Sequence, residues 1–158
     1  MKIKSLLAPL LLLAAGCAWA DAPFTVSSDG QEVTDGKTGL IWRRCAEGMT
    51  ATVSGCTGTA STYTHEAALT RARDQAASTS VAWRLPNVKE LASIADRSKS
   101  NPAIDGVAFP DTPVDAFWSS SPFVGNADVA WVVNFNFGNV YLNLRVSTLP
   151  VRLVRAGQ

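Results

Sequence analysis

The fold of this chain is decided at residues 83–90, which read Trp83-Arg84-Leu85-Pro86-Asn87-Val88-Lys89-Glu90. Trp83 and Leu85 alternate with Arg84, a pattern typical of a half-buried extended segment. Pro86 disfavours helix at Leu85, because the proline ring clashes with the residue before it. We therefore expect a strand-like segment that ends at a rigid turn, with Trp83 anchored in the core and Arg84 paired with a carboxylate.

The second half of the run predicts the start of a helix. Asn87 is a favoured N-cap residue, and Glu90 follows three positions later. At that distance the Glu90 carboxylate can accept a hydrogen bond from the Asn87 backbone N–H, which completes a capping box. Apolar residues at helical spacing begin at Val88, and the predicted helix ends near Asp96. The run thus predicts a corner of the fold and contains no arrangement of reactive groups.

The first 20 residues predict an export signal peptide. Two lysines precede an apolar run, residues 6–15, that is too short to span a bilayer. Ala18-Trp19-Ala20 has the small-x-small pattern that signal peptidases recognise. An alternative is a lipoprotein, with lipidation at Cys17. Either processing route predicts an exported domain, residues 21–158, that is periplasmic, secreted or held at the cell surface.

The composition of this expected mature chain disfavours some classes of function. Without residues 1–20, 12 of the 14 basic side chains remain against 13 acidic ones. A dedicated nucleic-acid binder needs a surplus of cations to displace phosphate counterions, so we expect no nucleic-acid partner. No second apolar run reaches membrane-spanning length, so we expect no transmembrane segment in the mature chain. The remaining length suits a single domain.

Cys45 and Cys56 are the two cysteines of the expected mature chain, and an even pair in an oxidising compartment predicts a disulfide. It would close a loop rich in glycine, threonine and serine, and loop entropy alone would make it worth about 2–3 kcal/mol. The alternatives are a metal site or a catalytic thiol. A metal site would need two further soft ligands, and the expected mature chain has one histidine and no other cysteine for them. We expect no metal and no cofactor.

Short strands are predicted in the N-terminal part of the chain, around Phe24 and Val26, at Val33 to Asp35 and from Thr38 to Cys45. Arg43 and Arg44 in the third segment are a candidate anion site. Adjacent strand residues point to opposite faces, however, so a solvated strand edge is the favoured interpretation.

A helix is predicted from His65 to about Ala77, with Thr64 as its N-cap. His65 is the only histidine and hence a candidate general base. No nucleophile motif accompanies it, so we predict a surface residue at the helix start.

A long irregular segment, residues 98–115, follows the second predicted helix. A loop of this length is usually functional or packed by its own side chains. Asp105, Asp111 and Asp115 could supply oxygen ligands to Ca²⁺, but their spacing matches no EF-hand loop. Solvated turn carboxylates are the favoured interpretation.

The C-terminal third predicts a β-hairpin with a two-residue turn at Gly138-Asn139. Trp131, Val133, Phe135 and Phe137 alternate along one face of its first strand. The other face of the hairpin collects the polar residues Asn134, Asn136, Tyr141, Asn143 and Arg145. Amides, a phenol and a guanidinium suit sugar hydroxyls or sulfates, and Tyr141 adds a stacking surface. These five residues are the candidate ligand-binding site, and the alternative is the solvated side of an antiparallel sheet.

Four tryptophans remain in the expected mature chain. Each one occupies a strand-like position with apolar neighbours, so core packing is favoured over a ligand platform. These predicted core residues are Trp42, Trp83, Trp118 and Trp131.

Several of these motifs together resemble one known family. In order, they are Val33 to Trp42 with its Thr-Gly-Leu-x-Trp element, Glu66 to Leu69, Ala82 to Leu91 with Trp-Arg-Leu-Pro-Asn, Phe117 to Ser120, Ala130 to Phe135 and Val151 to Arg155. The chain resembles the Lcl C-terminal domain family, a bacterial domain of unknown function found in exported and surface proteins. The resemblance spans about residues 29–155.

The resemblance implies an α+β domain, a variant of the C-type-lectin-like fold with two helices and a twisted antiparallel sheet. Its best-known relative is an adhesin domain that binds sulfated glycosaminoglycans. The chain departs from the family pattern at Leu153, where many members carry a cysteine. It also lacks the Glu-Pro-Asn, Gln-Pro-Asp and Trp-Asn-Asp triplets of calcium-dependent lectins, so calcium-dependent sugar binding is not implied.

We expect an exported, non-enzymatic binding module that presents the polar face of its hairpin to a glycan or a surface protein in adhesion. One alternative is a structural accessory subunit of an envelope or pilus assembly. Another is a metal- or thiol-dependent enzyme, because the wider fold superfamily includes oxygen-dependent cysteine-modifying enzymes. That chemistry needs reactive thiols, and the two cysteines are better explained as a disulfide.

Overall fold

The computed structural model describes residues 23–157. The expected signal peptide, residues 1–20, and the lipidation candidate Cys17 lie outside this range. The elements in chain order are β1 (Phe24–Val26), β2 (Glu32–Asp35), β3 (Leu40–Arg43), β4 (Thr50–Ala51), β5 (Cys56–Thr57), β6 (Thr62–Tyr63), α1 (His65–Thr79), α2 (Val88–Ser93), β7 (Ala116–Pro122), β8 (Val129–Asn134), β9 (Asn139–Leu144), β10 (Leu149–Pro150) and β11 (Val154–Ala156). Among these residues, no helix has the length and apolar character needed to cross a bilayer.

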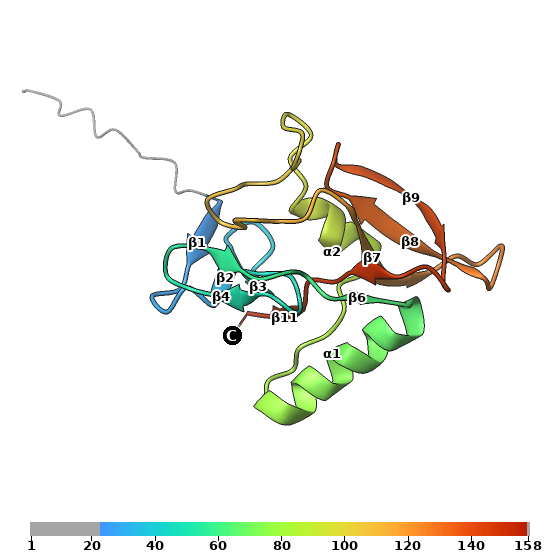
Figure 1. The fold of residues 1–158 in the computed structure, drawn as a ribbon, viewed down its shortest axis with the longest axis horizontal. Coiled ribbons are helices and arrows are strands. Elements are labelled where there is room, and N and C mark those ends of the chain that lie inside the picture. The colour runs from blue at the N-terminus through green and yellow to red at the C-terminus, as the bar shows by residue number, and fades with distance from the viewer. Residues whose placement is uncertain (1–22, 158) are drawn as a thin grey trace, which may run out of the picture.

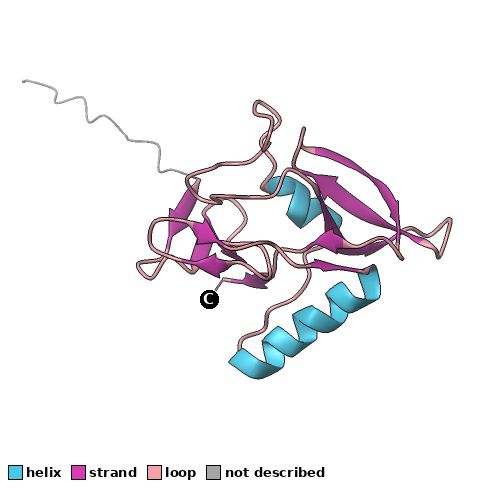
Figure 2. Ribbon diagram, in the orientation of Figure 1, coloured by secondary structure: helices cyan, strands magenta, loops and turns pink. Residues whose placement is uncertain are grey.

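The described chain is a small α+β fold with two helices and antiparallel sheets, as expected (Figure 2). The larger sheet has the strand order β1-β2-β3-β11, and a second sheet has the order β7-β8-β9. Two short pairs, β4-β5 and β6-β10, connect loops. Helices α1 and α2 lie on opposite sides of β7 (Figure 1).

The larger sheet is built around Trp42 on β3. Trp42 lies opposite Val33 of β2 and Val154 of β11, and all three side chains are fully buried. The last strand, β11, covers only part of the Val151 to Arg155 motif. It begins at Val154, because the carbonyls of Val151 and Leu153 accept hydrogen bonds from Glu47 and Arg43 instead of continuing a regular ladder.

The β7-β8-β9 sheet separates two hydrophobic clusters, which we call the α2-side core and the α1-side core. Phe117 and Val133 belong to the α2-side core, whereas their neighbours Trp118 and Val132 belong to the α1-side core. A solvated face, the alternative stated for the hairpin, is therefore wrong for β8, and β7 is covered on both faces as well. Neighbouring strand residues point to opposite faces, and here a helix covers each face.

The hairpin of β8 and β9 differs from its prediction in its turn. Asn134 pairs with Asn139, so the loop has four residues, Phe135–Gly138, in place of two. Gly138 ends the loop with φ +73°, a conformation that favours glycine. Phe137, expected on the apolar face, is 62% exposed at the hairpin tip because the strand has already ended. Trp131 is only half-buried and packs edge-on against Phe123.

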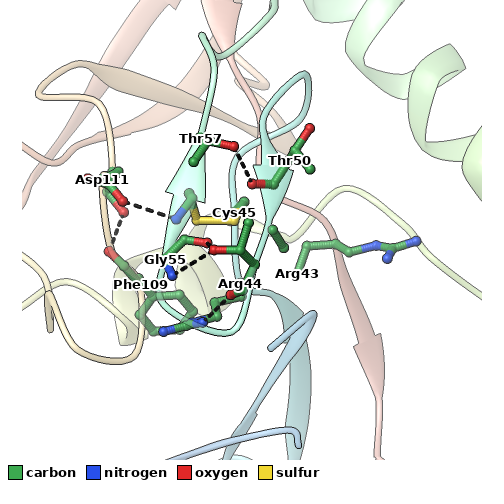
Figure 3. Close-up of a disulfide and its surroundings, with 12 residues drawn as sticks. Arg43, Arg44, Cys45, Thr50, Gly55, Thr57, Phe109 and Asp111 are labelled. Atoms are coloured by element: carbon green, nitrogen blue, oxygen red, sulfur yellow. Dashed lines mark hydrogen bonds between the residues drawn. A yellow bond between two sulfur atoms is a disulfide. The ribbon is translucent and has the colours of Figure 1, made fainter. Parts of the chain in front are cut away.

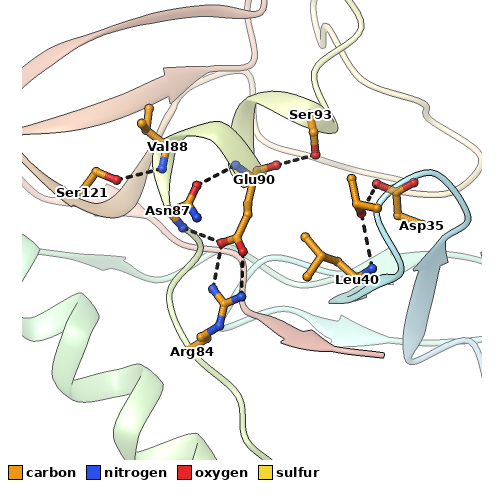
Figure 4. A network of polar contacts seen from close by, with 9 residues as sticks. Asp35, Leu40, Arg84, Asn87, Val88, Glu90, Ser93 and Ser121 are labelled. Atoms are coloured by element: carbon orange, nitrogen blue, oxygen red, sulfur yellow. Dashed lines mark hydrogen bonds and ion pairs between the residues drawn. The ribbon is translucent and has the colours of Figure 1, made fainter. Parts of the chain in front are cut away.

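The corner at residues 83–90 has the predicted structure (Figure 4). The Asn87 side chain accepts a hydrogen bond from the Glu90 backbone N–H at 2.9 Å, and the Glu90 carboxylate accepts one from the Asn87 N–H at 2.8 Å. Arg84 donates both terminal guanidinium nitrogens to the same carboxylate, at 2.7 and 2.8 Å. Helix α2 ends at Ser93, earlier than predicted, because Ala95 already pairs with Ile104 of the following loop.

This corner is bonded to both sheets. Arg84 and Val154 of β11 exchange two backbone hydrogen bonds, at 2.9 and 3.0 Å. The Pro86 carbonyl accepts from the Ser120 N–H of β7 at 2.7 Å. Trp83 is buried beneath them, 3% exposed, with the Arg43 guanidinium 4.3 Å from its ring centroid. The corner is thus the joint between the two sheets.

The predicted disulfide between Cys45 and Cys56 is present, and Figure 3 shows its surroundings. Arg44 is buried beneath the loop that the disulfide closes and donates to the carbonyls of Thr52 and Val53, at 2.9 and 3.2 Å. The prediction of a solvated edge is therefore wrong for Arg44. Its cation replaces water as the donor to the Val53 carbonyl and is a second donor to the Thr52 carbonyl, which also accepts from the Gly55 N–H.

Replacing Trp83 with alanine should lower the free energy of unfolding by about 3–5 kcal/mol, because a fully packed indole leaves a cavity at the joint. Denaturant unfolding followed by circular dichroism measures the change. Val107→Ala, at a position 81% exposed, is the control and should change stability by less than about 0.5 kcal/mol. A loss below about 1 kcal/mol for Trp83→Ala would contradict its role as core anchor.

Candidate functional site

The five polar residues predicted as a ligand site lie at different places on the hairpin. Asn134 and Asn136 are at its loop, where the Asn134 side chain accepts from the Asn136 N–H at 2.7 Å. Tyr141 packs against the α1-side core. Asn143 accepts a hydrogen bond from a serine hydroxyl at 3.1 Å. Arg145 lies beyond the other end of β9, so the hairpin does not gather these groups into one patch.

Arg145 is the one of the five that lines a hollow beside α1. This hollow has a volume of about 300 Å³ and is lined by Thr64, His65, Glu66, Leu69, Arg145 and Val146. A larger hollow of about 480 Å³ is lined by Glu66, Leu69, Ala72, Arg73, Trp83, Arg84, Leu85 and Ser120. Glu66 and Leu69 line both. We call the two together the α1 trough, a surface that sequence reasoning missed.

The α1 trough has an apolar floor. Leu69 and Ala72 come from α1, and Trp83 and Leu85 come from the extended half of the corner. The helix lies close to the corner because its packing residues are small: Ala68 and Ala72 are buried against the α1-side core. Small residues at this spacing could have predicted a helix seated close to its neighbour.

The rim of the α1 trough carries mainly positive charge. Arg73 is exposed, and Arg145 stands at the opposite end. Arg84 is also on the rim, where its hydrogen bonds to Glu90 raise the pKa of the guanidinium and lower the pKa of the carboxyl. Glu66 is the acidic residue on the rim. The trough thus combines apolar and cationic contacts.

His65 is buried, 1% exposed, so the prediction of a surface histidine is wrong. Its Nε2 lies 3.0 Å from the Ser119 carbonyl, and its Nδ1 lies 3.2 Å from Nε of Arg145. A carbonyl and a guanidinium fix the tautomer: Nε2–H donates, and Nδ1 accepts. The Trp118 ring packs edge-on at 5.2 Å. The sequence carries a signal for this burial, since His65, Ala68 and Ala72 share one helical face.

The surroundings of His65 favour its neutral form. Burial lowers the pKa of His65, and the charge of Arg145 lowers this pKa further, while the Ser119 carbonyl opposes both. Both ring nitrogens already have partners, so His65 is placed to hold the start of α1 against β7. It is not poised for proton transfer to a ligand.

Arg152 is, like Arg44, a buried cation, and no sequence motif pointed to its burial. It is completely buried, and burial lowers the pKa of Arg152 to about 9. Its guanidinium donates to the carbonyls of Arg43 and Arg44 and to the Thr112 hydroxyl, and it stacks on Phe109 at 4.9 Å. These contacts join β3 to the long loop and leave no space for a ligand.

The carboxylates proposed for Ca²⁺ all bind backbone N–H groups. Asp105 accepts from Val107 and Ala108, Asp111 from Cys56, and Asp115 from Ala116. Within residues 23–157, no three histidine, cysteine or acidic side chains are grouped in a way that could hold a metal ion. Buried residues such as Ile104 and Phe109 show that the long loop is packed by its own side chains.

Comparison with known proteins gives one match. The family model of the Lcl C-terminal domain matches residues 31–155, which is most of the chain. No curated protein and no solved structure matches the chain.

Acidification should destabilise the protein through His65. Because folding lowers the pKa of His65, its contribution to stability is fully present above about pH 6.5 and is lost as the pH falls through the folded-state pKa. Thermal unfolding between pH 7 and pH 5 should show this loss. His65→Gln, which keeps a hydrogen-bond donor and an acceptor but does not titrate, should flatten the dependence. Equal slopes for both proteins would show that His65 does not contribute.

Proposed function

The chain belongs to the Lcl C-terminal domain family, and on this premise we propose that it is an exported, non-enzymatic binding module. The α1 trough is its binding site, and the ligand is a segment of a partner protein of the cell envelope. The open, apolar floor of the trough between α1 and the corner is the observation that carries this proposal.

Two broader features of the proposal rest on the sequence and the family. The fold is proposed to be a variant of the C-type-lectin-like fold, which two helices and an antiparallel sheet support. Export is supported by the signal-peptide pattern of residues 1–20 and by the disulfide, since disulfides persist in oxidising compartments.

The chemistry of the floor favours a protein ligand over a sugar. Sugars are usually held by an exposed aromatic face, and the Trp83 ring is buried and covered by the Arg43 guanidinium. Half-buried Leu69 is instead the most accessible apolar side chain of a shallow surface whose floor is formed by the buried Ala72 and Leu85, and this surface suits one or two aliphatic or aromatic side chains. The ligand is therefore an extended or helical segment with an apolar anchor residue.

The charges on the rim indicate which ligand residues would lie beside the apolar anchor residue. Arg73 and Arg145 lie at opposite ends of the α1 trough, whereas Glu66 lies between them. Arg84 is already neutralised by Glu90. Charge complementarity then favours acidic residues on both sides of the apolar anchor.

A binding role also fits the state of the groups that could do chemistry. Cys45 and Cys56 are joined, and both nitrogens of His65 are hydrogen-bonded within the protein. A catalytic use of either group would require a change of these partners. We therefore propose binding in preference to a thiol-dependent enzyme.

Selection from a displayed library of random peptides tests the proposal. The mature protein should enrich peptides with an apolar residue flanked by Asp or Glu. Arg73→Glu should weaken binding of the selected peptides at least about tenfold, because it replaces an attraction by a repulsion. Lys89→Glu, the same charge reversal on exposed α2 away from the trough, is the matched control.

A different result would contradict this assignment. If Lys89→Glu weakened binding as much as Arg73→Glu, the effect would be that of net charge alone. If the protein bound a glycan array, and Tyr141→Ala combined with Arg145→Ala abolished that binding while Arg73→Glu did not, the site would lie on the hairpin and the ligand would be a glycan.

A further inference from the structure

Strand β9 forms an open edge of the β7-β8-β9 sheet. It is the outermost strand in the sheet order, and Figure 1 shows it at the periphery of the fold. Its sequence, Asn139-Val140-Tyr141-Leu142-Asn143-Leu144, has no charge, no proline and no glycine. Its pairing with β8 is continuous over six residue pairs, without a bulge. Natural edge strands usually carry lysine, proline or a bulge that prevents further pairing, and β9 has none of them.

The backbone groups that face outward can be assigned from the register. The Arg145 N–H donates to the Asp128 carbonyl, so these two residues form a hydrogen-bonded pair. Such pairs alternate along an antiparallel ladder, which puts Tyr141 and Asn143 in bonded pairs with β8 and turns the backbone of Val140 and Leu142 outward. Within residues 23–157, no other segment donates to or accepts from the backbone of Val140 or Leu142.

The side chains of the same residues form an apolar strip. Leu142 lies opposite Trp131, and Leu144 lies opposite Val129, on the sheet face that α2 covers only near Val140. Leu144 is 54% exposed, and Trp131 and Leu142 are half-buried. An outward-facing backbone therefore coincides with an incompletely covered apolar face.

We infer that β9 is a self-association surface at which a second copy of this chain adds its own β9, antiparallel and related by a two-fold axis at Leu142. In this register Leu142 faces Leu142 of the other copy, and Val140 faces its Leu144. The two three-stranded sheets become one six-stranded sheet, and the apolar strips of the two copies join on one face.

Charge and symmetry select a second copy as the occupant. The residues that pair at the axis, Val140, Leu142 and Leu144, are all apolar and neutral, so a two-fold interface brings no like charges together. The nearest charged residue is Arg145, and the register places it opposite Asn139. The strand is thus complementary to itself. Unlike the α1 trough, it offers no charge pattern that would select another protein.

Cysteine crosslinking tests the register. Leu142→Cys places the new thiol opposite its own copy at a Cα separation of about 5.5 Å, which suits a disulfide. Under mild oxidation, most of the mature Leu142→Cys protein should become a covalent dimer. Val140→Cys is the matched control, because Val140 lies about four residues, or roughly 13 Å, along the strand from its own copy. It should stay largely monomeric.

Sedimentation velocity tests the association itself. The wild-type mature protein should show a monomer–dimer equilibrium that Leu142→Lys shifts to monomer, since two like charges would meet at the axis. Val107→Lys, the same kind of change at a residue 81% exposed elsewhere, should leave the equilibrium unchanged. A wild-type protein that stays monomeric at millimolar concentration, or equal crosslinking of the two cysteine variants, would overturn the inference.

Discussion

The corner at residues 83–90 is the constraint on which the rest of the structure depends, and the bidentate pair between Arg84 and Glu90 ties its two halves together. The same carboxylate closes the capping box of α2, so one side chain fixes both the helix start and the extended segment before it. That segment is bonded to β11 through Val154 and to β7 through Ser120. The corner therefore sets the distance between the two sheets, and it supplies Trp83 and Leu85 to the floor of the α1 trough.

Buried cations replace regular secondary structure elsewhere in this small fold. Arg44 supports the carbonyls of the disulfide loop, and Arg152 supports the carbonyls of residues 43 and 44. Each guanidinium supplies donors to carbonyls that lie at or beyond the ends of short strands. The two proposed surfaces differ in position: the α1 trough lies on the α1 side of the β7-β8-β9 sheet, the pairing surface is the β9 edge of that sheet, and Arg145 lies next to both. Partner binding at the α1 trough and pairing at β9 could then occur together, so that a dimer would bind through two sites.

The sequence predicted the features that local rules determine. The capping box, the Thr64 cap, the disulfide and the family all follow from residue type and spacing within short stretches, and the structure and the family match confirm them. The predictions from the sequence were wrong where the burial of a residue depends on a segment far away in the chain. The residues near His65 in the sequence do not predict that Ser119 and Arg145 are its partners. The sequence near β8 does not predict that helices cover both faces of the sheet. The spread of the five polar residues along the hairpin has the same origin, since alternation assigns residues to a face but does not show what covers that face.

Native-state hydrogen exchange at the amides of Arg84 and Val154 tests most directly whether the corner is the joint of the fold. These two amides donate to each other's carbonyls, which joins the corner to β11 of the larger sheet. If the corner holds the sheets together, both amides should exchange only through global unfolding, with opening free energies equal to the stability measured by denaturant. Exchange of either amide through a local opening well below that value would show that the sheets are held together elsewhere.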